Sequence, residues 1–176
     1  MAFVSGPVSL NAADIRSIPI DINLIVDGSP ALDKARDEVK AWISDNLVDR
    51  LFQEGDRITI WNAGKTARIV YSDNLKSIGW RDNIKKSLES LSAEGDSADF
   101  AGALREAAAR DSGGNMNYTL LISGSSASLS PTLLGSGANL MKYSRVEEFR
   151  GWRALVIALN IDSRVRRAAA AYLSGA

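Results

Sequence analysis

A chain of 176 residues has the length of a single domain, and at this size it can bury enough surface to fold without disulfides or structural metals. Its 21 basic and 21 acidic residues cancel, so its net charge gives no reason to expect nucleic acid or an anionic membrane surface as a partner. Cysteine and histidine are both absent, which excludes thiolate sites, histidine-based triads and the commonest metal ligand and general base.

Residues 1–17 are expected to form an N-terminal extension and residues 18–176 a single domain. The extension lacks the basic start and apolar core of a signal peptide. No apolar stretch of the sequence approaches the ~20 residues that span a bilayer, so we expect no membrane insertion by this segment. The compartment is left open, with an extracytoplasmic domain excised from a longer bacterial protein as one expectation.

Strand and helix patterns alternate along the chain. The apolar run Ile18–Val26 predicts a strand buried on both faces, and apolar residues three and four apart between Leu32 and Leu51 predict a long helix. Two β-branched runs, Arg57–Trp61 and Ala67–Tyr71, lie close enough to form an antiparallel hairpin. Further helices are predicted over 80–91, 99–110 and 165–173, and further buried strands over 118–123 and 154–160.

This alternation predicts an α/β fold with a doubly wound, mostly parallel sheet and helices on both faces, as in Rossmann-like proteins. The hairpin adds one antiparallel edge strand. The Gly/Ser-rich stretch 124–143 has little periodicity and is predicted to be a long connection without regular structure, of a kind that often carries function.

Polar residues follow several of the predicted strands. In open α/β sheets, ligands bind at the carboxyl ends of the strands, where neighbouring loops diverge. One loop that opens a helix and two strand ends supply candidates for a binding site at this edge: Asp27, Ser29, Ser97, Asp99, Ser123 and Ser125.

The order of elements and these loops resemble the von Willebrand factor type A domain from about Ile18 to Ala176. The segment EGDRITIWNAGKTARIVYSD resembles that family's second and third strands, and GDSADFAGALREAA resembles its loop and helix with a Thr-Asp-x-x-x-Ala-Leu pattern. The closing LVIALNID fits as well. The resemblance implies a protein-binding domain whose adhesion site holds Mg²⁺, with a partner's carboxylate completing the coordination.

The resemblance also implies that the metal site is degenerate. In the family's Asp-x-Ser-x-Ser loop, Asp27 and Ser29 match the first two ligands, whereas Ala31 stands at the third. Ala98 replaces the family's threonine, with Ser97 beside it, and Ser123 stands where the family has an acid before glycine. Mg²⁺ is usually held by one or two carboxylates plus waters. We therefore predict no cofactor, with at most weak Mg²⁺ binding at the remnant formed by Asp27 and Ser29.

Each candidate also has a structural interpretation. Asp27 and Ser29 are suited to hydrogen-bond the turn after their strand and to cap the following helix, and Asp99 to cap its own helix. Ser123 and Ser125 are also typical of a turn. Trp42 lies near the apolar stripe of its helix and is predicted to be in the core.

Three functions follow. The first is a non-catalytic domain that binds another protein without metal. The second is a Mg²⁺- or Mn²⁺-dependent binder in which Ser97 and waters replace the lost ligands. The third is an enzyme that uses carboxylates or hydroxyls, although the sequence contains no Walker A, Gly-x-Gly-x-x-Gly or Gly-x-Ser-x-Gly motif.

Overall fold

The computed structural model describes residues 18–110, 115–133, 153–158 and 162–167. Within these ranges five strands form one sheet in the order β3-β2-β1-β4-β5. Strand β1 is parallel to both β2 and β4, β4 is parallel to β5, and only the β2–β3 pair is antiparallel. The strands are β1 (Ile20–Asp27), β2 (Arg57–Ala63), β3 (Ala67–Asn74), β4 (Met116–Ser123) and β5 (Arg153–Ala158).

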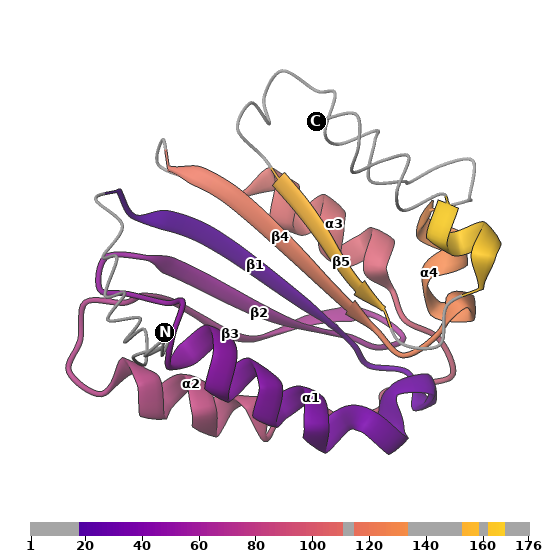
Figure 1. The fold of residues 1–176 in the computed structure, drawn as a ribbon, viewed down its shortest axis with the longest axis horizontal. Helices are drawn as coiled ribbons and strands as arrows, with labels where there is room; N and C mark the ends of the chain where they lie inside the picture. Colours follow the sequence, from indigo (N-terminus) through magenta and orange to yellow (C-terminus); the bar gives the residue numbers. More distant parts are fainter. Residues whose placement is uncertain (1–17, 111–114, 134–152, 159–161, 168–176) are drawn as a thin grey trace, which may run out of the picture.

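Helices cover both faces of the sheet (Figure 1). On one face lie a 3₁₀ helix (Pro30–Ala35), α1 (Arg36–Trp42) and a π-helical segment (Ile43–Val48), which follow one another without a break, and α2 (Trp80–Leu88). On the other face lie α3 (Phe100–Ala109), α4 (Ser126–Leu133) and a helical turn over 163–167. The predicted fold class is therefore confirmed, including the antiparallel edge strand.

The alternation of side chains along each strand divides the core in two. In β1, Leu24 and Val26 pack toward α1 and α2, whereas Ile25 packs toward α3. The apolar residues paired with them in β2 and β4 follow the same division, because side chains of a strand alternate between the two faces. The α3 face is filled by Trp61, Phe100 and small alanines, which let this helix lie close to the sheet.

Two predictions need correction. Trp42 is 38% exposed and is not a core residue, because Val39, Ile43 and Leu47 occupy the buried face of its helix. The stretch 124–143 is not wholly without regular structure, since α4 occupies Ser126–Leu133. The rest of that stretch, the N-terminal extension 1–17 and most of the closing helix lie outside the described residues. Of the helices described, none is long and apolar enough to cross a membrane.

Candidate functional site

Asp27, the last residue of β1, is fully buried and ties two loops together. One carboxylate oxygen accepts the Ser29 amide at 2.8 Å, and the other accepts the Gly124 amide at 2.9 Å and the Ser123 hydroxyl at 3.3 Å. The loops after β1 and β4 touch, because a Cβ added at Gly124 would lie 2.5 Å from the backbone carbonyl of Ala31. The predicted role of Asp27 in holding the turn is therefore confirmed.

Arg36 fastens the loop after β1 through its backbone. Its guanidinium is buried and donates hydrogen bonds to the carbonyl oxygens of Asp27 and Ser29, both at 3.0 Å, and to the Asp33 carboxylate at 2.8 Å. A full positive charge thus lies in contact with the loop that supplies metal ligands in the von Willebrand A pattern. Sequence reasoning missed this residue, because an arginine in a strongly charged stretch is usually solvated.

Three serine hydroxyls form a row across the junction of the two loops. The Ser29 hydroxyl lies 3.2 Å from that of Ser128, which lies 3.2 Å from that of Ser125. Ser125 also accepts the amide of Ser128 at 3.2 Å, so it caps α4. The capping interpretation of Ser29 is wrong: it occupies the position before the 3₁₀ helix, but its side chain makes no capping bond. Ser128 was missed, although a serine three residues after another is a capping spacing.

The loop before α3 supplies the remaining candidates. Asp99 caps α3, since its carboxylate accepts the Gly102 amide at 2.8 Å, and this structural interpretation is confirmed. Asp96 and Ser97 are exposed. The loop is held against the one after β1 by a 2.7 Å bond from the Glu94 amide to the Gly28 carbonyl.

The side chain of Glu94 is fixed by an ion pair with Arg68 on β3. The hydrogen bond from Arg68 lowers the pKa of the Glu94 carboxyl below its ordinary value, against an opposing effect of desolvation. Together with the backbone bond to Gly28, this pair anchors the beginning of the loop before α3.

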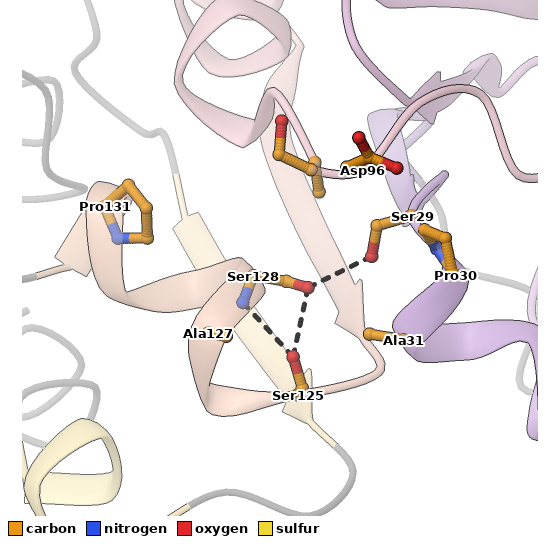
Figure 2. A pocket seen from close by; sticks show the side chains of 10 residues that line it. Ser29, Pro30, Ala31, Asp96, Ser125, Ala127, Ser128 and Pro131 are labelled. Carbon is orange, nitrogen blue, oxygen red and sulfur yellow. Dashed lines mark hydrogen bonds between the residues drawn. The ribbon is translucent and has the colours of Figure 1, made fainter.

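These loops enclose a hollow of about 210 Å³ at the carboxyl edge of the sheet (Figure 2). Three predicted residues, Ser29, Ser97 and Ser125, line it, although Ser29 is itself nearly buried. Asp27 and Ser123 are buried and do not line it, and Asp99 is turned to its own helix. The full lining consists of Ser29, Pro30, Ala31, Asp96, Ser97, Ala98, Ser125, Ala127, Ser128 and Pro131.

The donor set of this hollow does not match a divalent metal. Among the described residues no group of three or more His, Cys, Asp or Glu side chains is arranged to hold an ion. Ala31 and Ala98 present methyl groups to the hollow, and Asp96 is the one carboxylate among the described residues that line it. The chemistry available is that of hydroxyl groups, short apolar walls and a single negative charge.

The sheet order and its loops define an open α/β domain with a hollow at the carboxyl edge of the sheet. No family model matches the sequence, and no curated protein does. Solved structures match along most of the chain, and by this likeness the chain has the fold of a von Willebrand factor type A domain. The predicted resemblance is thus confirmed at the level of the fold.

Three such structures illustrate the likeness. A von Willebrand factor type A protein of Catenulispora acidiphila is 16% identical, with a TM-score of 0.65 over 89% of this chain and 37% of its own length. Proximal thread matrix protein 1 of the mussel byssus, with a zinc-occupied MIDAS motif, is 14% identical, with a TM-score of 0.64 over 89% and 39%. The manganese-loaded TRAP protein of Plasmodium vivax is 15% identical, with a TM-score of 0.59 over 87% and 63%.

Proposed function

We propose that this chain is a non-catalytic protein-binding domain that engages another protein through the hollow at the carboxyl edge of its sheet and needs no metal ion to do so. The observation that carries the proposal is the use of Asp27: both carboxylate oxygens accept hydrogen bonds from donors of the chain itself. Two structures of the same fold hold zinc and manganese, and their metal sites are properties of those proteins.

The neighbours of Asp27 support metal independence. Mg²⁺ is small, strongly hydrated and demands near-octahedral oxygen ligands. Alanines stand at two of the ligand positions implied by the resemblance, and Ser123 supplies a hydroxyl where an acid is expected. The buried Arg36 guanidinium donates to the carbonyl oxygens of Asp27 and Ser29, so two backbone oxygens of the first loop are already used within the chain.

The serine row supports the absence of catalysis. A serine nucleophile needs an adjacent base that is itself held in place. The hydroxyls of Ser29, Ser125 and Ser128 are bonded to one another, and the chain contains no histidine. These features favour a surface that binds over one that reacts.

Metal independence is tested by thermal unfolding of the metal-stripped protein with and without millimolar Mg²⁺ and Mn²⁺. We expect no shift in Tm for the wild type. A variant that rebuilds the ligand set, Ala31→Ser with Ala98→Thr and Ser123→Asp, serves as positive control. At an ion concentration 100 times its dissociation constant, binding adds about 2.7 kcal/mol, or roughly 5–10 °C at this chain length. A metal-dependent rise in the wild type would favour the Mg²⁺- or Mn²⁺-dependent binder instead.

Protein binding is tested by placing an arginine in the hollow. Ala127 is exposed on α4 and lines the hollow, so Ala127→Arg fills it at little cost to folding. Ala41, exposed on α1, gives the matched control Ala41→Arg. In pull-downs with EDTA present, a specific partner is retained by the wild type and Ala41→Arg and lost with Ala127→Arg. Retention by all three proteins would place the binding surface elsewhere.

A further inference from the structure

The hydroxyl row in the hollow offers more acceptors than donors. Each of the three hydroxyls has one proton and two lone pairs. The two bonds that join Ser29, Ser128 and Ser125 use a proton and a lone pair each, and the Ser128 amide takes another lone pair of Ser125. More lone pairs than protons therefore remain on the row in Figure 2, in which Ser29 and Ser128 are buried and Ser125 is half-buried. A surplus of lone pairs suits a ligand that donates hydrogen bonds.

Several backbone amides near the hollow are already used. The amides of Ser29 and Gly124 donate to Asp27, that of Ser128 to Ser125, and that of Gly102 to Asp99. Helix N-termini bind anions through free N–H groups. Because these four N–H groups are paired within the chain, they are not available to an anionic group in the hollow.

The charge and the walls of the hollow also favour a ligand that is cationic and partly apolar. Asp96 is exposed, and it is the one charged side chain among the described residues of the lining. The remaining walls, from Pro30, Ala31, Ala127 and Pro131, are apolar. The positive charge of Arg36 does not oppose this, since its guanidinium is directed to loop carbonyls and to Asp33.

We propose that the hollow receives a lysine or arginine side chain of the protein partner. Such a side chain has an apolar stem and a cationic head with several donors, which matches apolar walls, excess lone pairs and one carboxylate. About 210 Å³ is room for about seven waters at ~30 Å³ each, enough for one long side chain with some of its hydration. This inference rests on the proposed function and gives its partner the opposite charge to the acidic ligand of a metal-loaded adhesion site.

The test is an NMR titration of the ¹⁵N-labelled full chain in EDTA. The probes are the N-acetyl, N-methylamide derivatives of lysine, arginine, norleucine and glutamate, where norleucine keeps the lysine stem without its charge. We expect saturable shifts around the hollow with lysine and arginine only. Asp96→Asn should raise the dissociation constant by up to about fivefold, the upper end of the range for one exposed charge pair. Asp45→Asn, at an exposed carboxylate of the π-helical segment, should leave it unchanged.

The other outcomes overturn the inference. Equal shifts with norleucine would mean that the hollow selects apolar stems, and saturation by glutamate would mean that it selects anions. Absence of saturable shifts, or lysine binding unaffected by Asp96→Asn, would remove the basic ligand altogether. In each of these outcomes the Tm of the wild type still does not change with Mg²⁺ or Mn²⁺. If metal independence itself fails, that Tm rises with the ion. The failure of this inference is therefore distinguishable from the failure of the proposed function.

Discussion

Replacing Asp27 by asparagine separates a structural carboxylate from a metal ligand. Asparagine keeps the shape but offers one oxygen and one NH₂ group where the carboxylate has two oxygens. Since those oxygens accept the Ser29 and Gly124 amides at 2.8 and 2.9 Å, one buried N–H group must then face another donor. An unpaired buried donor costs about 1–3 kcal/mol, and the lost charge weakens the remaining bond by roughly 1 kcal/mol. The free energy of unfolding should fall by about 2–4 kcal/mol.

The assay is urea denaturation in EDTA, followed by the fluorescence of the buried Trp61 and Trp80. The expected loss corresponds to a fall in Tm of roughly 4–16 °C for a chain of this length. The exposed control Asp45→Asn should change stability by no more than about 0.5 kcal/mol. The reasoning would be refuted if Asp27→Asn were as stable as the wild type in EDTA and less stable than the wild type only with Mg²⁺ added. A carboxylate that serves as a metal ligand contributes to stability only when its ion is present.

Three further predictions concern the surrounding loops. Arg36→Met leaves two buried carbonyls without their donor and should lower the free energy of unfolding by about 2–4 kcal/mol in urea denaturation; a loss below about 1 kcal/mol would mean that water replaces the guanidinium. Asp99→Ala should lower the free energy of unfolding by about 1 kcal/mol, because it removes the cap of α3. Gly102→Ala should recover about 1 kcal/mol only in the Asp99→Ala background, because in the wild type the added Cβ would lie 2.1 Å from the Asp99 carboxylate. Additive effects of the two substitutions in a double-mutant cycle would contradict this. Because Arg68 lowers the pKa of Glu94, the pair stabilises the fold above the ordinary pKa of 4.5, and this contribution is lost as pH falls through the lower folded-state pKa; Arg68→Ala should weaken that pH dependence in a series of Tm measurements.

The order of strands and helices was predictable because the central strands are continuous apolar runs. A parallel strand covered on both faces has no polar side to interrupt it, so Leu24 to Val26 and Leu120 to Ile122 read as buried strands without any contact known. Helix α4 escaped prediction for the opposite reason. It has no apolar stripe and contains Pro131, which disfavours a helix interior by about 3 kcal/mol. Burial of Leu129 and Thr132 and the cap from Ser125 override that preference.

The edge that carries the site was predictable, but the direction of its side chains was not. Parallel strands end at the same edge, which brings Asp27, Ser29 and Ser125 together from sequence alone. Whether a carboxylate points inward to backbone amides or outward to a ligand depends on the close approach of Gly124 to Ala31, a contact between loops 93 residues apart in the sequence. Arg36 likewise reaches the first loop only because the chain between them folds as a 3₁₀ helix.

An edge that binds without a metal ion accepts a different partner charge from an edge that holds one. A metal ion with two positive charges attracts a partner carboxylate, whereas the lining described here presents Asp96 and a surplus of hydroxyl lone pairs. Two unit charges 4 Å apart interact by about 1 kcal/mol in water and about 4 kcal/mol near a protein surface with an effective dielectric constant of 20. A partner carboxylate in the hollow is therefore repelled and a partner ammonium attracted, and because Asp96 is exposed the interaction lies at or below the lower of these figures. Since Asp96 is exposed, this preference should weaken as salt shortens the screening length, so the affinity for a basic partner should fall with ionic strength.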